Sequence, residues 1–244
     1  MKINHLLAII LWIASSVITS AQNSISFFSN QHKNSVENVF NTVEFTYSPV
    51  TQKQIKDKYN QTTDETAFAL SYAQARQVLD SHPLYVQYGL GLQYAYHINE
   101  DQDDVDYNGT LYSGGFNVLT SFFTAKIPVN VLYTFEIPET RMTFMPYAGL
   151  HLLGHLVGQQ KDTEWFSVNG DRETTTEKTN LFSSEDMGDH KLNRFIIGWQ
   201  VGAKMAFNKF LIGVAYEGPM SNLEKSDTYT LRRSQTNISI GIMF

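Results

Sequence analysis

The chain has 244 residues, of which 42% are hydrophobic and 17% charged, so we expect one domain of ordinary size. Its formal charge is −6 and its Lys and Arg residues form no long run, which argues against binding to a phosphate backbone, so no nucleic-acid partner is expected. The absence of cysteine excludes disulfides, thiolate metal sites, cysteine nucleophiles and a lipid anchor on cysteine.

Residues 1–21 have the layout of a cleaved signal peptide. Lys2 gives a positive start, residues 6–18 are largely apolar, and small residues end the segment at Ala21. This apolar run is too short for a membrane-spanning helix. A buried N-terminal helix is the alternative, but the order of the features favours a signal peptide. We therefore expect an exported protein whose single mature domain covers residues 22–244.

Alternation of apolar and polar side chains dominates the mature chain. In residues 83–98 every even position from Leu84 to Ile98 is apolar or aromatic, whereas the odd positions are mostly polar or small. Strands of globular proteins average about 5–6 residues, whereas a tilted membrane strand needs about 9–11. The pattern recurs and predicts eight strands, at about residues 39–47, 67–79, 83–98, 120–136, 141–157, 193–207, 209–218 and 233–244.

Residues 67–79 alone are ambiguous, because this Ala-rich segment has an apolar helical face as well as an apolar strand face. The connections favour a strand. Counted as eight strands, short connections alternate with long ones, the long ones being residues 48–66, 99–119, 158–192 and 219–232. Outer-membrane barrels show this asymmetry, and in hydrocarbon the sheet must close to pair its backbone groups. The predicted fold is therefore all-β, an eight-stranded antiparallel transmembrane β-barrel (an up-and-down meander) with short periplasmic turns and long extracellular loops.

Four short motifs and the last residue carry a family resemblance. They are Ser20-Ala21-Gln22, Lys126-Ile127-Pro128-Val129, Pro146-Tyr147-Ala148-Gly149-Leu150, Tyr216-Glu217-Gly218-Pro219-Met220-Ser221-Asn222-Leu223 and the terminal Phe244. In these the chain resembles the outer-membrane β-barrel domain family of Bacteroidota, the PorT-like group. The resemblance implies a Gram-negative cell envelope and a barrel architecture. Some members are linked to protein secretion, so an accessory role in a secretion machinery is one alternative function.

An eight-stranded barrel is just wide enough for side chains to fill it. Alternation predicts an inward set of acids, bases, amides and one tyrosine that forms a polar plug, which disfavours a porin. An ion path or a ligand cradle is the alternative. The predicted inward set is Glu44, Arg76, Gln87, Gln93, His97, Lys126, Tyr147, His151, Arg194, Gln200, Lys204 and Glu217.

Catalysis needs a nucleophile beside a base. Small outer-membrane barrels include lipid A deacylases and acyltransferases, which use a serine near a histidine. His151 and His155 have no serine within two residues, and no Gly-x-Ser-x-Gly elbow occurs. His97 is the remaining candidate base, with Ser113 or Ser121 as its partner. We expect no enzyme, no catalytic residue and no cofactor, and a lipid-modifying enzyme is the alternative.

The predicted outer connections carry two further signals. Asp104-Val105-Asp106-Tyr107-Asn108-Gly109 matches the front half of a calcium loop, but the twelfth position is Gly115 instead of a bidentate Glu. We expect a solvated acidic loop, in which Asp104, Asp106 and Asn108 are a weak divalent-cation candidate. Asn169-Gly170 is a strong two-residue turn, which predicts that the fifth and sixth strands project beyond the membrane as a hairpin. A plain extended loop is the alternative.

These observations predict a monomeric, non-enzymatic protein integral to the cell outer membrane. Its role is structural or interactive, with outer-membrane lipid or lipopolysaccharide around it and a protein partner at its extracellular loops. The main competitor is a secreted, soluble, lipocalin-like binding barrel with the apolar faces inside. Glycines such as Gly89, Gly149 and Gly202 lie on the polar faces and fit a narrow lumen better than a solvent face. The membrane barrel is therefore favoured.

Overall fold

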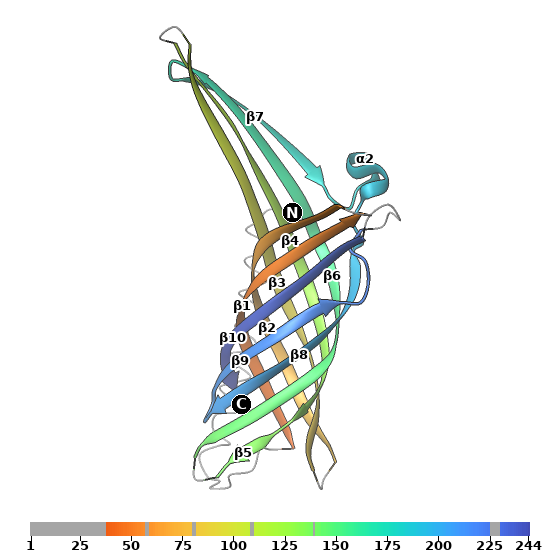
Figure 1. The fold of residues 1–244 in the computed structure, drawn as a ribbon. Coiled ribbons are helices and arrows are strands. Elements are labelled where there is room, and N and C mark those ends of the chain that lie inside the picture. Colours follow the sequence, from red (N-terminus) through yellow and green to blue (C-terminus); the bar gives the residue numbers. More distant parts are fainter. Residues whose placement is uncertain (1–37, 57–58, 80–81, 108–109, 139, 225–229) are drawn as a thin grey trace.

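The computed structural model describes residues 38–56, 59–79, 82–107, 110–138, 140–224 and 230–244, so the predicted signal peptide at residues 1–21 lies outside the described part. Eight long strands form the body of the molecule (Figure 1). They are β1 (Val39–Lys56), β2 (Tyr59–Leu79), β3 (His82–Tyr107), β4 (Thr110–Tyr133), β6 (Met142–Val168), β8 (Phe195–Phe207), β9 (Phe210–Pro219) and β10 (Thr230–Met243). The short elements are β5 (Phe135–Ile137), β7 (Asp171–Asn180), α2 (Ser184–Met187) and η2 (Gly188–His190). Within the described ranges, no helix has both the length and the apolar character needed to cross a membrane.

The long strands form a closed antiparallel ring. Neighbours in the chain pair with one another around the ring, and β1 pairs with β10, so that Thr42 lies opposite Met243. The ring is completed by β4 and β6, which pair from Tyr112 opposite Val168 down to Leu132 opposite Tyr147. The predicted eight-stranded antiparallel barrel is therefore confirmed.

The ambiguous segment at residues 67–79 is a strand, because it forms the lower part of β2 and pairs on both sides, with β1 and β3. Its small residues, such as Ala67 and Ala75, are fully buried inside the barrel, whereas Phe68 and Leu70 are exposed outside. Two ladders of backbone hydrogen bonds and this separation of the faces outweigh the helical propensity of alanine.

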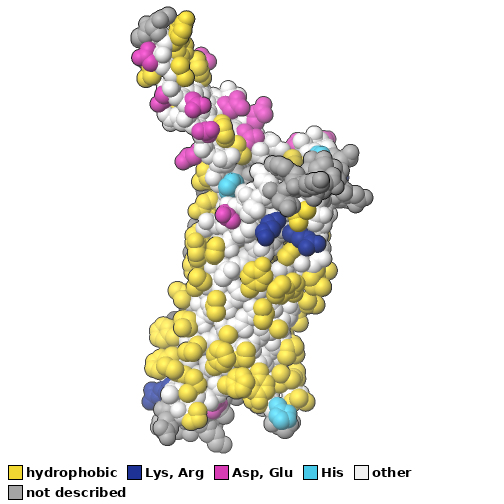
Figure 2. Space-filling model, viewed as in Figure 1, with side chains coloured by type: hydrophobic (Ala, Val, Ile, Leu, Met, Phe, Trp, Pro, Cys, Tyr) yellow, Lys and Arg dark blue, Asp and Glu magenta, His cyan; other side chains and the backbone are white. Residues whose placement is uncertain are grey.

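The outside of the barrel is apolar and the inside largely polar. Every strand in the ring carries exposed aromatic or aliphatic side chains on its outward face, and these cover the lower and middle parts of the molecule (Figure 2). Phe195 and Phe210 are 72% and 71% exposed, whereas Glu44, Gln87 and Glu217 are buried inside. A lipocalin-like barrel would have the reverse arrangement, so the predicted orientation of the two faces is confirmed.

Three of the predicted long loops are largely strand. Residues 48–66 continue β1 and β2, and residues 99–119 continue β3 and β4 out to a turn near residue 108. The loop predictions were wrong there because polar segments outside a membrane keep pairing even where their faces no longer alternate between apolar and polar. Residues 158–192 contain the outer part of β6 and all of β7, followed by α2 and η2.

The predicted hairpin at Asn169-Gly170 is present, with both residues at positive φ, 49° and 97°. Its returning strand is β7, however, and not the predicted sixth strand. That predicted strand corresponds to β8, which pairs with the lower part of β6 and does not reach the hairpin. Above the last β2–β3 pair, Thr66 opposite Tyr96, the outer parts of β3, β4 and β6 continue together with β7 as a four-stranded sheet (Figure 1). We call this sheet the projection; it comprises residues 98–107, 110–120, 157–168 and 171–180.

Candidate functional site: the barrel interior and the projection

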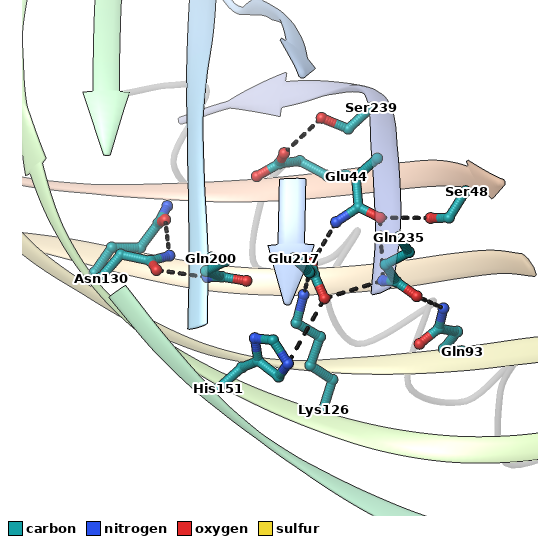
Figure 3. A network of polar contacts seen from close by, with 12 residues as sticks. Glu44, Ser48, Gln93, Lys126, Asn130, His151, Gln200, Glu217, Gln235 and Ser239 are labelled. Carbon is teal, nitrogen blue, oxygen red and sulfur yellow. Dashed lines mark hydrogen bonds and ion pairs between the residues drawn. The ribbon is translucent and has the colours of Figure 1, made fainter. Parts of the chain in front are cut away.

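A carboxylate from β9 lies at the centre of a network of polar side chains inside the barrel (Figure 3). Glu217 is buried and forms an ion pair with Lys126 of β4. Asn237 and Gln235 of β10 also donate hydrogen bonds to Glu217, and His151 Nε2 of β6 lies 3.8 Å from its second oxygen. Side chains of β9 and β10 on one side of the ring and of β4 and β6 on the other therefore meet at one carboxylate, which is paired as a buried charge requires.

A second carboxylate, Glu44 of β1, is held lower in the barrel. It accepts a hydrogen bond from Lys204 Nζ of β8, and Thr42 and Ser239 donate to its two oxygens at 3.0 and 3.1 Å. The ammonium group of Lys204 also lies 5.2 Å from the centre of the Tyr147 ring. Glu44 and Glu217 thus each have a lysine partner that compensates the buried charge.

Amide side chains fill the space between these ion pairs. Gln200 donates to Asn130, which donates to Gln87 at 3.2 Å, and Gln93 donates to Gln235 at 3.0 Å. The cavity that remains at the centre holds only about 80 Å³. This volume has room for a few water molecules, and the interior is therefore a plug and not an open path.

Apolar layers close the barrel on both sides of the polar cluster. The lower layer is formed by Phe40, Ala75, Tyr85, Leu132, Met145, Ala206 and Leu211. The upper layer contains Val50, Ala67, Ala95, Phe122 and Leu181, with Phe182, Met187 and Leu192 packed on it. The segment around α2 therefore folds back across the outer mouth, where the Leu192 amide donates to the Leu181 carbonyl at 2.9 Å.

The structure confirms most of the predicted inward set and corrects two members. Glu44, Gln87, Gln93, His151, Gln200, Lys204 and Glu217 are buried, and Lys126 and Tyr147 are half-buried among them. Arg76 is exposed outside, because the inward positions of β2 are odd-numbered. Arg194 is also exposed, and its guanidinium lies over the Phe182 ring at 4.7 Å. His97 lies at the rim, where its Nδ1 is 2.7 Å from the backbone oxygen of Asp64.

The prediction missed a third ion pair, because Glu65 lay in the predicted loop 48–66 and Arg233, the first residue of the predicted strand 233–244, was not included in the inward set. Arg233 is paired with Glu65 at 2.6 Å, and its guanidinium lies 5.3 Å from the centre of the Phe122 ring. A continued parity count along β10 from Asn237, which is inward, would have placed Arg233 inside the barrel as well.

The candidate catalytic pairs are not formed. His97 pairs across the sheet with Thr120, so Ser121 points to the opposite face, and Ser113 lies much farther out, opposite Asp104. His155 is buried, with its Nδ1 2.8 Å from Thr124 Oγ1, and its ring lies between those of Phe122 and Phe182. In these contacts no histidine has a serine beside it.

The divalent-cation candidate lies in a strand, so the predicted loop geometry was wrong. Asp104 and Asp106 belong to the outer end of β3, where Gln102 Nε2 donates to Asp104 at 3.3 Å. Asn108 lies outside the described residues. Nowhere in the described part of the chain do three or more His, Asp or Glu side chains form a group that could hold a metal ion.

The projection has an acidic and aromatic face that continues the inner surface of the barrel. Across the sheet Asp101 lies opposite Phe116, which lies opposite Glu164, and Gly114 lies opposite Phe166, which lies opposite Glu173. A groove of about 500 Å³ runs between these side chains. The two outer edges of this sheet, formed by β3 and β7, have no neighbouring strand among the described residues. The projection therefore offers an exposed sheet face and free strand edges.

No family model and no curated protein sequence matches the chain, so the PorT-like resemblance stays a prediction. Among solved structures, similar folds are Ail, the attachment invasion locus protein of Yersinia pestis, Neisserial surface protein A and the outer membrane enzyme PagL. Their sequence identities are 14%, 9% and 12%, and the TM-scores are 0.33, 0.37 and 0.36. The matches cover 85%, 85% and 80% of this chain and 100%, 98% and 97% of theirs. These likenesses concern the fold alone.

Proposed function

We propose that the chain is a monomeric, non-enzymatic outer-membrane protein that holds the projection outside the cell to bind a protein partner. In this proposal a cleaved signal peptide exports the chain, outer-membrane lipid surrounds the barrel, and the protein belongs with the PorT-like group. The observation that carries the proposal is that apolar side chains lie outside the barrel and paired charges inside, the reverse of a soluble barrel. A ring with apolar groups outside and paired charges inside is unstable in water but matches a bilayer.

The packed interior supports an anchoring role over transport. Two apolar layers and the polar cluster leave a central cavity of about 80 Å³, far below what a solute path needs. The projection supports an interaction role, because free strand edges add extended peptides through backbone hydrogen bonds. Its exposed aromatic groups, such as Phe116, Phe166 and Tyr107, add apolar contact area at low entropic cost.

The embedding can be tested with the two described tryptophans, which lie in different places. Trp199 points outward from β8 and is 38% exposed next to Tyr216, whereas Trp165 lies on the projection beside Arg172. We would reconstitute the purified protein, as Trp165→Phe and Trp199→Phe variants, into vesicles with brominated acyl chains. We expect strong quenching when Trp199 is retained and weak quenching when Trp165 is retained. Equal quenching, or a protein soluble without detergent, would overturn the proposal.

Two further measurements separate the alternatives. Cells that overexpress the chain should show unchanged lipid A acylation, and an altered acylation pattern would favour the lipid-modifying enzyme. Protease added to intact cells should cut within the projection and leave a barrel fragment whose gel mobility still changes on boiling. Full protection of the projection in intact cells would contradict its exposure outside the cell.

A further inference from the structure

Two basic side chains lie directly opposite each other on the outside of the barrel. Lys53 of β1 and Arg232 of β10 are cross-strand partners, and both side chains are exposed. They point outward, because the next residue of β10, Arg233, points inward to Glu65. Figure 2 shows Lys and Arg side chains over the upper ends of β1 and β10, immediately above the apolar surface.

Among the described residues the outward pair has no ion-pair partner. Side chains in direct opposition have Cβ atoms about 4.5–5.5 Å apart, where like charges destabilise a sheet. Within the described ranges, neither Lys53 nor Arg232 takes part in an ion pair. Among the residues that the structure describes, the nearest outward acid by register is Asp64 of β2, and its carboxylate accepts a hydrogen bond from Thr51 at 3.3 Å. An external anion would therefore relieve a repulsion that the fold leaves in place.

Two hydroxyl groups lie next to the basic pair on its membrane side. Thr51 and Ser234 are the next outward cross-strand partners along β1 and β10, so the four side chains form a two-by-two patch. We call this patch the outer basic site, composed of Thr51, Lys53, Arg232 and Ser234. The Thr51 hydroxyl already donates to Asp64, but Arg232, Lys53 and Ser234 supply guanidinium, ammonium and hydroxyl donors, which is the donor set that a phosphate group requires.

Along β1 and β10 the polarity of the outward residues changes in the same order as the layers of a lipid leaflet, from apolar to polar to charged. Below the site the cross-strand pairs Tyr47–Ile238 and Phe45–Ile240 are apolar, and hydroxyl groups and then charges follow above. Lys53 lies four residues beyond Pro49, which is about 10 Å along the membrane normal for a strand tilted by about 40°. Long basic side chains reach back toward the interface over this distance. The site therefore lies at the level of the outer headgroups.

We propose that the outer basic site binds a phosphate group of lipid A in the outer leaflet. The inference rests on the proposed function, since it requires the barrel to lie in the outer membrane. In the bound state Arg232 donates two parallel hydrogen bonds to the phosphate, Lys53 supplies the second positive charge, and Ser234 donates from its hydroxyl. The bound phosphate bridges β1 and β10, the seam where the first and last strands close the ring.

The experiment measures lipid retention by native mass spectrometry of the purified full chain in detergent. The probes are bisphosphorylated lipid A, the same lipid after enzymatic removal of its phosphates, and inorganic phosphate as competitor. The test variant is K53Q/R232Q. The matched control is K161Q/K178Q, because Lys161 and Lys178 are also exposed cross-strand partners but lie on the projection. The charge-conserving variant K53R/R232K tests whether positive charge alone suffices.

We expect the wild-type chain to prefer bisphosphorylated over dephosphorylated lipid A at least tenfold. K53Q/R232Q should lose most of this preference, whereas K161Q/K178Q and K53R/R232K should keep it. Equal preference in K53Q/R232Q and wild type, equal loss in the control, or displacement of the lipid by equimolar inorganic phosphate would overturn the proposal. Each variant is first checked for a mobility shift on boiling and for Trp199 quenching by brominated lipid. A failure of membrane embedding is thereby distinguished from a failure of the site.

Discussion

Removal of the central carboxylate tests whether the barrel interior is a stabilising network. In Glu217→Ala the ammonium group of Lys126 loses its partner, and Asn237 and Gln235 lose an acceptor. Breaking a buried ion pair by removing one partner costs about 3–5 kcal/mol. The Lys126 side chain is 17% exposed and adjoins the small central cavity, so it can recover part of its hydration. We therefore expect the free energy of unfolding to fall by about 3 kcal/mol.

The assay is equilibrium unfolding by urea in lipid vesicles, followed by tryptophan fluorescence and by gel mobility without boiling. Glu173→Ala is the matched control, because Glu173 is an exposed acid of the projection, and its loss should change the stability by less than about 0.5 kcal/mol. Lys126→Ala and the double variant complete a mutant cycle. The loss of stability in the double variant should be smaller than the sum of the losses in the two single variants, by more than about 1 kcal/mol. A loss of stability below about 1 kcal/mol for Glu217→Ala, or strictly additive losses in the cycle, would refute a stabilising ion pair between Glu217 and Lys126.

Three further outcomes follow from the geometry. Gly149→Val should prevent folding or cost several kcal/mol, because a Cβ there would lie 2.7 Å from Asn130 Cα. Gly114→Val should be tolerated, since the nearest atoms to a Cβ there lie at 3.7 Å. The fraction of protein whose gel mobility changes on boiling measures folding in both variants. Gly170→Val forces a branched residue to a φ of 97° and should cost about 1–2 kcal/mol locally. Hydrogen exchange should therefore rise in β7 and not in β9, and a uniform rise would contradict a separate projection. In planar bilayers the wild-type chain should give no steady conductance, and porin-like currents would contradict the packed interior.

The alternation of side chains by itself determined the fold class and most of the interior. Period two assigns each residue to one face, so the pattern by itself places Glu44, Gln200 and Glu217 inside the barrel. The rule needs only local information, because a strand in a barrel exposes one face to lipid and the other to a narrow lumen. The same rule places Arg76 outside, because Phe68, Leu70 and Tyr72 share its parity and form the apolar face of β2.

Only the tertiary structure decided where the strands end and which groups meet. Outside the membrane both faces of a strand are solvated, so the apolar contrast that marks a strand disappears while its backbone pairing continues into the projection. A bulge in β6 adds one residue, Leu156, between the partners of Phe123 and Thr124, so the inward positions change from odd to even above it. The Glu217–Lys126 pair joins residues 91 positions apart. Their contact depends on strand register and on closure of the ring, which a local pattern does not encode.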